Sequence, residues 1–452
     1  MSSPEEAFKL VTFIVEAFGC PSSQYEGEAI RALLLKEGFC EAGMPGASAV
    51  PQVYIINSCT VTESAARKVR QAARRARKLY PGATVVITGC YPQVYPGQLL
   101  SQLPEVEIIL GNEGREELPG LIRRRMKEKG APAWNLAKET PPAEPLEKLC
   151  VEMDYRRARP VIKIQEGCDW QCRYCIISRA RGIPRSLPRE KAVQQAQNFL
   201  EKGFGEIILT GTHLGLYGKD LAHETLESLL EELERLPFDF RIRLSYIEPG
   251  SINRELLRFI GKSEKVCSYL YLPLQSGSDP VLEKMGRQYS VEDLESILKE
   301  AKDLVPGLGV QADVIVGYPG ETEEDHRATL ERLEKWGLSG LHVFPYSPRP
   351  QTPAYTLEEK VPPEIIKRRS TEMKELNQQL TRRFYEKMKG AVLRVLVERV
   401  EDGWAKGYSD NNAWVTFPVK KSKISLKGRL VKIRVVQPGN EGIQGELEGT
   451  AD

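Results

Sequence analysis

Three cysteines in one short segment constrain this 452-residue chain more than any other feature. Cys168, Cys172 and Cys175 are spaced C-x3-C-x2-C. Three thiolates so close together can hold three irons of a 4Fe–4S cluster and leave the fourth iron open to a small molecule, whereas a cluster that only carries electrons normally has four cysteine ligands. Structural zinc is the alternative, but zinc usually takes four ligands in two pairs, and the next histidine after the loop is His213. The spacing therefore predicts a reactive iron–sulfur cluster.

Length and composition narrow the class of protein. A chain of 452 residues suggests about three domains, each able to bury its own core. The longest apolar runs are strand-sized, so we expect no membrane span, and the first residues, Met-Ser-Ser-Pro, do not resemble a secretory signal. We therefore expect a cytoplasmic protein. Its nine cysteines are an odd number and give no disulfide framework, and in a reducing compartment cysteines more often bind metal, although Cys40, Cys150 and Cys267 are expected to be ordinary.

The first part of the chain alternates between strand and helix patterns. Short apolar runs predict strands at 12–17, 53–57, 85–88 and 106–110, with helices such as 25–37 and 64–79 between them. This alternation is typical of a small α/β domain with a mostly parallel sheet, which we expect at 8–130. Closely spaced prolines then predict a linker at 131–157.

A second strand–helix pattern fills residues 158–389. It predicts strands at 161–165, 206–210, 241–246, 269–274, 310–316 and 341–346, with helices between them. Six such units suit a partial (β/α)6 barrel, since a complete (β/α)8 barrel needs more chain. A long polar helix at 363–389 is expected to close this domain.

The last part of the chain, 390–452, contains no helical pattern. Five alternating segments separated by Gly, Asn and Asp turns predict strands at 391–400, 403–408, 414–417, 429–436 and 442–448. We expect a small antiparallel β-barrel. The fold class is thus α/β, with an N-terminal parallel-sheet domain, a central partial barrel and this terminal β-barrel.

Three further cysteines, Cys20, Cys59 and Cys90, each fall just past the end of a predicted strand. The carboxyl ends of parallel strands gather on one edge of an open α/β sheet, so these thiols would converge there. Gly19 and Gly89 would let the backbone approach a bulky cluster closely. Free cysteine is also commonly buried for structural reasons, and no spacing rule applies to residues so far apart. The residues alone leave both interpretations open.

The C-x3-C-x2-C loop resembles the signature of radical S-adenosylmethionine (SAM) enzymes, in which the open iron binds SAM. With the N-terminal cysteines, nearly the whole chain resembles the methylthiotransferase family of that superfamily. The resemblance implies a C-terminal TRAM barrel and two 4Fe–4S clusters, the first held by Cys168, Cys172 and Cys175 and the second by Cys20, Cys59 and Cys90.

Flanking residues indicate a branch of that family. Residues 57–62 (Asn-Ser-Cys-Thr-Val-Thr) and 209–215 (Leu-Thr-Gly-Thr-His-Leu-Gly) look like the branch that acts on threonylcarbamoyl-adenosine in tRNA, as do the more widely shared 274–279 and 342–347. One departure is Pro-Ser-Ser at 21–23, where this branch more often has Lys-Val-Asn.

The resemblance implies a tRNA-modifying enzyme that adds a methylthio group to carbon 2 of the modified adenine at position 37, in the anticodon stem-loop. SAM would be both radical source and methyl donor, and a flavodoxin- or ferredoxin-like protein would supply electrons. Alternatives are a methylthiotransferase for isopentenyl-adenosine or for a ribosomal protein, and a non-catalytic iron–sulfur RNA-binding protein. Oligomeric state is not indicated by the sequence.

Candidate SAM contacts lie near the cluster loop and at strand ends. Tyr174 is in the loop itself, where simple packing is the alternative role. Gly211 and Gln275 follow the second and fourth predicted strands, at the rim where barrel active sites lie. The superfamily's usual Gly-Gly-Glu after the second strand is replaced by Thr-Gly-Thr at 210–212. Glu248 and Asp313, at other strand ends, could contact SAM or substrate or bind loop amides.

RNA contacts have two candidate sources. Residues 67–78 carry seven basic side chains and no acid, which favours phosphate binding over a merely solvated helix face. These candidates are Arg67, Lys68, Arg70, Arg74, Arg75, Arg77 and Lys78. The terminal barrel is the second source, because aromatic side chains such as Trp404 lie among its basic residues and could stack on bases; for Trp414 and Phe417 a core position is the alternative.

Overall fold

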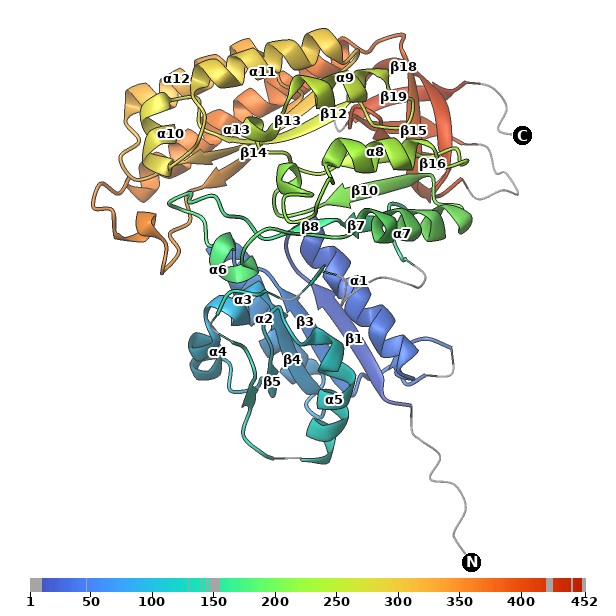
Figure 1. Cartoon of the computed structure of the whole chain (residues 1–452), viewed down its shortest axis with the longest axis vertical. Coiled ribbons are helices and arrows are strands. Elements are labelled where there is room, and N and C mark those ends of the chain that lie inside the picture. Colours follow the sequence, from blue (N-terminus) through green and yellow to red (C-terminus); the bar gives the residue numbers. More distant parts are fainter. Residues whose placement is uncertain are drawn as a thin grey trace, which may run out of the picture. The chain divides into compact units, whose positions relative to one another are not determined.

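The computed structural model describes residues 10–45, 47–128, 130–138, 140–143, 145–146, 155–419, 426–439 and 442–448. The chain forms two compact units. The first comprises Met1–Asp154 with the segments Gly167–Asp169 and Ile176–Ile183, and the second comprises Tyr155–Glu166, Trp170–Cys175 and Pro184–Asp452. Figure 1 shows the elements of both units in sequence colours.

A single parallel sheet organises the first unit. Its strand order is β2-β1-β3-β4-β5-β6, and every pairing is parallel. The strands are β1 (Thr12–Ala17), β2 (Cys40–Glu41), β3 (Val53–Ser58), β4 (Thr84–Gly89), β5 (Ile108–Ile109) and β6 (Trp134–Asn135). The predicted parallel sheet is confirmed. The predicted linker at 131–157 was wrong at β6, which pairs with β5; residues 147–154 of that linker, with Cys150, lie outside the described part of the chain.

Helices cover both faces of this sheet because its strands are apolar on both sides, as parallel strands usually are. Ile56, Val85 and Ile87 face the cluster that includes the helix α2 (Glu63–Leu79) and the short helices α3 (Cys90–Val94) and α4 (Pro96–Gln102). Val53, Ile55 and Val86 face α1 (Pro21–Lys36) and α5 (Leu118–Lys127). Helix α1 starts earlier than the predicted residue 25, since Pro21 suits the first helical turn.

The central part of the second unit is a partial barrel of six parallel strands. The strands β7 (Val161–Lys163), β10 (Glu206–Thr210) and β11 (Arg241–Leu244) form one sheet, and β12 (Tyr269–Gln275), β13 (Gly309–Val316) and β14 (Gly340–Pro345) form another. Parallel bridges, Ile242 to Val266 and Tyr246 to Tyr271, connect the two sheets. This arrangement confirms the predicted partial (β/α)6 barrel.

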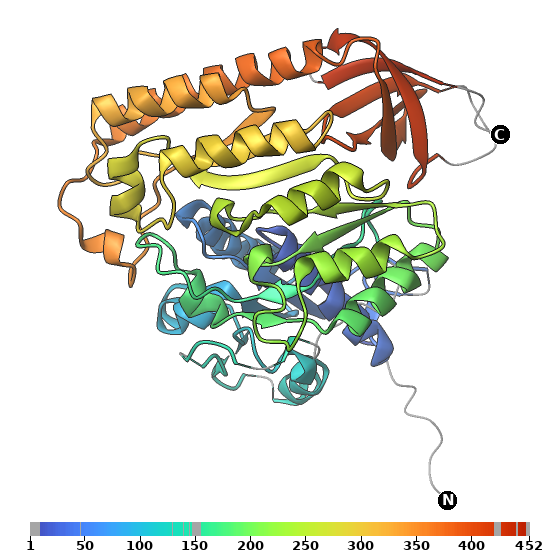
Figure 2. The same ribbon diagram turned by 45° about the horizontal axis from the view of Figure 1, so that its top comes forward.

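Helices follow these strands in the expected order. They are α7 (Arg189–Glu201), α8 (Leu226–Glu234), α9 (Arg254–Lys262), α10 (Asp279–Met285), α11 (Val291–Leu304), α12 (Glu323–Trp336) and the closing α13 (Pro363–Glu386). In both views α12 and α13 lie side by side over β14 and its neighbours (Figure 2). Among the helices of the described residues, none is both long enough and apolar enough to cross a membrane.

The chain ends in a closed five-stranded barrel, as predicted. Its strands, in the order β15-β16-β17-β19-β18, are β15 (Val392–Glu401), β16 (Trp404–Ser409), β17 (Trp414–Pro418), β19 (Gly442–Leu447) and β18 (Leu430–Gly439). The pairing is antiparallel except between β17 and β19, which run parallel, so the expectation of a wholly antiparallel barrel was wrong at that seam. Phe417 is fully buried in the barrel core.

A buried ionic cluster fastens this barrel to the partial barrel. Glu206, at the start of β10, is fully buried and pairs with Arg241 and with Arg243, the latter at 2.8 Å. The two guanidinium groups then donate hydrogen bonds to backbone carbonyls of the terminal barrel, including Tyr408 at 2.6 Å and Ser409 at 2.8 Å. Burial alone would raise the pKa of Glu206, but the neighbouring arginines hold it well below its usual range.

We expect Glu206→Gln to destabilise the second unit by about 3–5 kcal/mol, because it leaves two buried guanidinium groups without their carboxylate. The folded pKa of Glu206 lies below the unfolded value of about 4.3. Its contribution is therefore fully present above that pH and is lost as the pH falls toward the folded value. Urea unfolding of wild type and variant should show a difference at pH 7 that shrinks below pH 4.

The matched control is Glu232→Gln, which removes an exposed pair with Arg235. We expect this control to cost less than about 1 kcal/mol at any pH. If both variants lowered the free energy of unfolding equally, the buried ionic cluster would stabilise the attachment of the barrel no more than an exposed ion pair does.

Candidate functional site

The fold brings the three N-terminal cysteines to one edge of the first sheet. Cys20 is the residue before α1, Cys59 directly follows β3, and Cys90 opens α3 directly after β4. Because β1, β3 and β4 are neighbours in the sheet and run parallel, all three cysteines lie at their carboxyl ends. The convergence expected from the strand pattern is therefore present.

Two glycines let the backbone pass close to these cysteines. Gly19 has a φ of +109°, and a Cβ atom there would lie 2.4 Å from the Cβ atom and 2.9 Å from the Sγ atom of Cys59. Gly89 has a φ of +103°, and a Cβ atom there would lie 2.5 Å from the carbonyl oxygen of Ser58. Any side chain at either position would displace the cysteine loops.

The three thiols influence one another electrostatically. Cys59 and Cys90 are buried, whereas Cys20 is partly exposed. Burial raises the pKa of Cys59 to about 12, and the negative charges of Cys20 and Cys90 add to that rise. Three neighbouring thiolates therefore repel one another in a dry place, and bound metal cations would relieve that cost.

A buried ionic cluster lies beside Cys90. The Nε atom of Arg181 is 3.0 Å from the Cys90 sulfur, and the Arg181 guanidinium also pairs with the fully buried Glu26. Arg115 binds the same carboxylate at 3.1 Å. Two guanidinium groups therefore share one carboxylate beside the cysteines, and one of them also contacts a cysteine sulfur.

These features fit an anionic iron–sulfur cluster. The Arg181 guanidinium beside Cys90 would offset the negative charge of a thiolate, and Gly19 and Gly89 let the backbone pass close to the cysteine loops. Within the described ranges no three His, Cys, Asp or Glu side chains are arranged around a single metal ion. That result is compatible with a 4Fe–4S cluster, because its cysteines bind different irons and do not converge on one point.

The second cysteine triad lies in the loop between β8 (Gln165–Glu166) and the short helix α6 (Ile177–Arg181). All three cysteines are partly exposed as residues. In the first unit, Cys168 donates its backbone N–H to the carbonyl of Gly182 at 3.0 Å. In the second unit, Cys175 donates to the carbonyl of Cys172 at 3.0 Å, and Arg173 donates to that of Met285 at 2.9 Å. These backbone hydrogen bonds hold the loop in place.

Arg287, which follows α10, is the main polar contact of this loop. Its guanidinium lies 3.2 Å from the Cys172 sulfur and 3.2 Å from the Tyr174 hydroxyl, and it pairs with Glu248. It also lies over the ring of Trp170, 5.6 Å from the centroid. Burial raises the pKa of Cys172, and the Arg287 charge counteracts that rise, which favours the thiolate that iron requires.

Tyr174 packs in the manner of a structural residue. Its ring lies edge-on to the ring of Tyr318, with the centroids 6.4 Å apart, and packs against the apolar cluster of Val281 and Met285. The Arg287 guanidinium donates a hydrogen bond to its hydroxyl. Glu248, whose partner is Arg287, and Asp313, which accepts a hydrogen bond from Tyr271, likewise have intramolecular contacts. SAM contacts by these side chains stay predictions.

Gly211 and Gln275 lie at the carboxyl ends of β10 and β12, as expected. A Cβ atom on Gly211 would lie 2.9 Å from the side chain of Gln165, so only glycine fits there without movement. Gln275 is a buried non-glycine residue with a φ of +68°. Such strained backbone clusters at ligand sites, so Gln275 remains a candidate for cofactor contact.

The predicted basic helix is α2, with Ala66, Val69 and other small residues packed against the sheet. Three of its seven basic side chains have carboxylate partners that the run itself did not indicate: Arg70 pairs with Glu63, Arg75 with Glu16 and Arg77 with Glu107. The other four are exposed and make no ion pair within the described residues, namely Arg67, Lys68, Arg74 and Lys78.

The barrel aromatics divide between surface and core. Trp404 is 43% exposed, which leaves its ring accessible. Trp414 is half-buried against Tyr408, with ring centroids 4.6 Å apart, and Arg159 lies over the Tyr408 ring at 4.6 Å. Phe417 fills the core. Trp404 is therefore the aromatic side chain here that is best placed to stack on a base.

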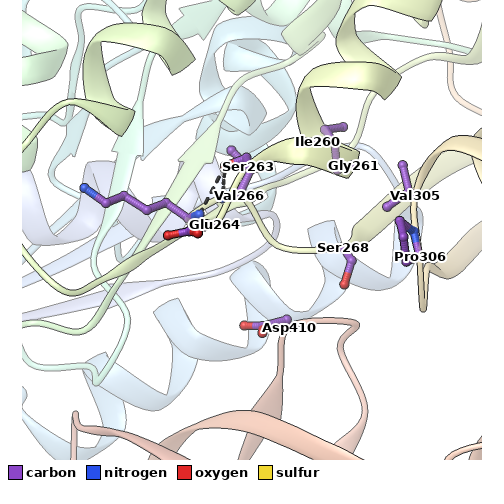
Figure 3. Close-up of a pocket in the computed structure, with 10 residues that line it drawn as sticks. Ile260, Gly261, Ser263, Glu264, Val266, Ser268, Val305, Pro306 and Asp410 are labelled. Carbon is purple, nitrogen blue, oxygen red and sulfur yellow. Dashed lines mark hydrogen bonds between the residues drawn. The ribbon is translucent and has the colours of Figure 1, made fainter.

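A pocket lies elsewhere on the second unit, between the end of α9 and the loops before β12 and β13 (Figure 3). Ser263, Lys265, Ser268 and Asp410 contribute to its lining. These positions are at the amino ends of the strands, whereas active sites of such barrels lie at the carboxyl ends. The pocket is therefore not the candidate active site.

Sequence reasoning missed the buried charges around both cysteine triads. Glu26, Arg115, Arg181 and Arg287 lie in ordinary-looking helical or turn segments, and no spacing links them to a cysteine. Only the folded chain brings Arg181 and Arg287 to sulfur atoms, and Glu26 and Arg115 to Arg181.

We expect Gln275→Gly to raise the free energy of unfolding of the second unit by about 1 kcal/mol. A non-glycine residue at positive φ costs roughly 1–3 kcal/mol of folding free energy. Glycine removes this strain, but its greater conformational entropy in the unfolded chain cancels part of the gain. Gln275→Ala should bring no gain, because alanine keeps the strain. Urea unfolding checks both variants.

Asp402→Gly is the positive control, since Asp402 has a φ of +52° at an exposed turn. A Gln275→Gly protein less stable than Gln275→Ala would show that the backbone strain at this site is small and that glycine only weakens the strand.

Two family models match this chain. Residues 162–333 match the model described as Radical SAM superfamily, and residues 12–111 match the model described as Uncharacterized protein family UPF0004. The first covers most of the partial barrel with its cysteine loop, and the second covers the strands that carry Cys20, Cys59 and Cys90.

Curated relatives align over nearly the full chain. A threonylcarbamoyladenosine tRNA methylthiotransferase, MtaB, of Bacillus subtilis (strain 168) is 36% identical and covers 96% of both chains. The MtaB of Aquifex aeolicus (strain VF5) is 37% identical over 93% of this chain and 99% of its own. A tRNA-2-methylthio-N(6)-dimethylallyladenosine synthase of Symbiobacterium thermophilum is 31% identical over 96% of this chain and 93% of its own.

Among solved structures, the radical SAM methyltransferase TsrM of Kitasatospora setae superimposes with a TM-score of 0.55 at 16% identity, over 77% of this chain and 75% of that one. This likeness supports the fold. With the two family models and relatives at 36% and 37% identity, the chain belongs to the radical SAM methylthiotransferase family and, within it, to the MtaB branch of transferases.

Proposed function

We propose that this enzyme attaches a methylthio group to carbon 2 of threonylcarbamoyl-adenosine at position 37 of tRNA. The observation that carries the proposal is the presence of two separate three-cysteine sites, each with a guanidinium group beside a cysteine sulfur. Relatives named for this activity align over nearly the whole chain. The dimethylallyl-adenosine activity is the second candidate, because relatives named for it also align at 30% and 31% identity.

The chemistry explains why a radical cofactor is needed. Carbon 2 of adenine carries a strong C–H bond of no useful acidity, so acid–base groups of the protein cannot activate it and a cofactor must supply the hard step. A 4Fe–4S cluster held by Cys168, Cys172 and Cys175 would supply this radical chemistry when bound together with SAM.

In this proposal Cys168, Cys172 and Cys175 hold the SAM-binding cluster, with Arg287 favouring the thiolate of Cys172. Gln275 and Gly211 contact SAM at the barrel rim, Gln275 through its side-chain amide and Gly211 through its backbone. Tyr174 supports the loop and contacts SAM only through its backbone.

A second 4Fe–4S cluster on Cys20, Cys59 and Cys90 would serve the sulfur transfer. The convergence of the three cysteines and the Arg181 guanidinium at the Cys90 sulfur support this assignment. A small electron-transfer protein, such as a flavodoxin or ferredoxin, would reduce the enzyme.

The tRNA anticodon stem-loop would bind the exposed basic face of α2, through Arg67, Lys68, Arg74 and Lys78. This helix begins shortly after Cys59, so its amino-terminal end is close in the chain to the second cysteine site. Its positive charge complements phosphate, and Trp404 offers a ring for base stacking.

Iron and sulfide analysis after anaerobic reconstitution tests the two-cluster assignment. We expect about eight irons per chain in wild type and about four in a Cys20/Cys59/Cys90→Ala variant, since each cluster has four irons. About four irons in both proteins would assign a structural role to the N-terminal cysteines, and the enzyme would then hold one cluster.

Nucleoside mass spectrometry tests the substrate. Reconstituted enzyme with SAM and a reductant should convert threonylcarbamoyl-adenosine in tRNA to its 2-methylthio derivative. The same assay on tRNA that carries isopentenyl-adenosine separates the second candidate. Release of 5′-deoxyadenosine distinguishes either enzyme from an iron–sulfur protein that only binds RNA.

A quadruple variant, Arg67/Lys68/Arg74/Lys78→Gln, tests the RNA face. We expect weaker tRNA binding and a shallower dependence on salt, with the log–log slope reduced by about 3–3.5 if each of the four residues contacts one phosphate, because each phosphate that the protein no longer neutralises lowers the slope by about 0.7–0.9. Affinity measured by filter binding across a salt series gives both values.

The matched control replaces four exposed basic residues on the outer helices of the second unit, Lys191, Lys262, Lys299 and Arg327, by Gln. It removes the same total charge, so a specific role for α2 requires that the control keep the wild-type salt slope. Identical slopes in the two variants would assign the effect to net charge alone.

A further inference from the structure

The segment that follows the C-x3-C-x2-C loop packs with the N-terminal domain. Residues Ile176–Ile183, which include α6, belong to the first compact unit. Ile176 and Ala180 join the apolar cluster that contains Cys90 and Tyr91. Arg181, six positions after Cys175, therefore lies within the domain of the other cysteine triad.

Arg181 uses all three of its nitrogens in this place. Its Nε atom donates to the Cys90 sulfur at 3.0 Å, while its two terminal nitrogens bind the two oxygens of Glu26. The two-point contact with Glu26 fixes the plane of the guanidinium and so directs the Nε–H at sulfur. Arg181 and Glu26 are both buried, so this geometry is shielded from water.

Neighbouring groups hold the same arrangement from other sides. Arg115 binds the carboxylate of Glu26 at 3.1 Å, and Asn112 donates to the carbonyl of Ala180 at 2.6 Å and lies 3.9 Å from the Cys90 sulfur. Arg115 supports Glu26 but makes no hydrogen bond to a cysteine among the described contacts. Within this ionic cluster the Cys90 sulfur is thus bonded by Arg181, with Asn112 at the limit of hydrogen-bond distance.

An arginine that only stabilised the fold would not need this geometry. A buried ion pair is by itself weak evidence for stability, because desolvation of both charges offsets their attraction. The Glu26 carboxylate already has a partner in Arg115, and the second arginine adds a positive charge at a sulfur atom. A buried positive charge in contact with a sulfur suits a thiolate better than a neutral thiol.

We propose that Arg181 is a positioning residue for the N-terminal iron–sulfur cluster. It binds the Cys90 thiolate through a charge-assisted hydrogen bond and supplies the positive charge that keeps the buried anionic cluster in place. The inference rests on the proposed function, since it assumes that Cys20, Cys59 and Cys90 hold a cluster.

Two measurable effects follow. Hydrogen bonds to cluster sulfurs and nearby positive charge stabilise the reduced, more negative state, so Arg181 raises the reduction potential of this cluster. The same hydrogen bond holds the Cys90 ligand, so its removal accelerates the release of iron. Groups that orient metal ligands typically change metal affinity by about 10–100-fold.

The experiment uses the full chain with Cys168, Cys172 and Cys175 replaced by Ala, which leaves only the N-terminal site. In this background we compare Arg181→Met, Arg181→Lys and Arg115→Met after anaerobic reconstitution. Iron per chain, the rate of iron loss to a chelator and the midpoint potential from EPR-monitored titration are measured. No assay of modified tRNA is needed.

We expect Arg181→Met to lose iron about tenfold faster than the parent and to have a lower midpoint potential. Arg181→Lys, which keeps the charge but not the fixed Nε–H, should recover part of the potential. Arg115→Met removes the other partner of Glu26 and should stay within about twofold of the parent in iron release, which separates a ligand contact from general loss of the buried ion pair. Equal behaviour of Arg181→Met and Arg115→Met would overturn the proposal.

A further variant covers the case in which Arg181→Met does not fold. The triple variant Glu26→Gln, Arg115→Met and Arg181→Met removes the carboxylate together with both of its guanidinium partners, so none of these three charges is left without its partner. This protein should fold and still lose iron about tenfold faster; normal retention of iron would contradict the role of Arg181.

The outcomes distinguish the inference from the proposed function. If the parent with only Cys20, Cys59 and Cys90 takes up no iron, the two-cluster assignment fails and the Arg181 proposal fails with it. If the parent holds about four irons and the Arg181 variants match it, only the Arg181 proposal fails.

Discussion

The structure of the first unit depends on the free-energy cost of bringing thiolates together in a buried place. Cys59 and Cys90 are removed from water, and Cys20 and Cys90 add negative charge to the surroundings of Cys59. Burial favours the neutral thiol, and positive charge beside the sulfur favours the thiolate that a metal ligand would need. Arg181 of the Glu26–Arg115–Arg181 cluster provides this charge at Cys90, and the backbone at Gly19 provides the space.

The second unit also has an arginine beside a cysteine sulfur. Arg287 lies beside Cys172 as Arg181 lies beside Cys90, and each guanidinium is oriented by a glutamate, Glu248 in one case and Glu26 in the other. Neither arginine precedes or follows a cysteine at a regular spacing. Both arrangements place a guanidinium group in a fixed orientation beside a cysteine sulfur. The positive charge favours the thiolate, which is the form of cysteine that binds metal.

Much of the fold could be predicted because it rests on local patterns. Alternating apolar strands and amphipathic helices indicated both α/β regions, and glycine-rich turns indicated the terminal barrel. The parallel pairing of β17 with β19 and the short strand β6 could not be predicted, since both depend on which distant segment closes a sheet edge. The convergence of Cys20, Cys59 and Cys90 could be predicted from strand ends. Arg181 and Glu26, by contrast, meet across a long sequence separation that no pattern encodes.

In the fold, fewer basic side chains of helix α2 are available to bind phosphate than its sequence alone indicates. A run of seven cations without an acid suggested a uniform phosphate-binding surface. In the fold, Glu16, Glu63 and Glu107 come from other segments or from the helix start and neutralise three of them. What remains is a narrower exposed set on one helix. Because electrostatic attraction to RNA scales with the phosphates actually neutralised, the affinity expected from this helix is that of four cations rather than seven.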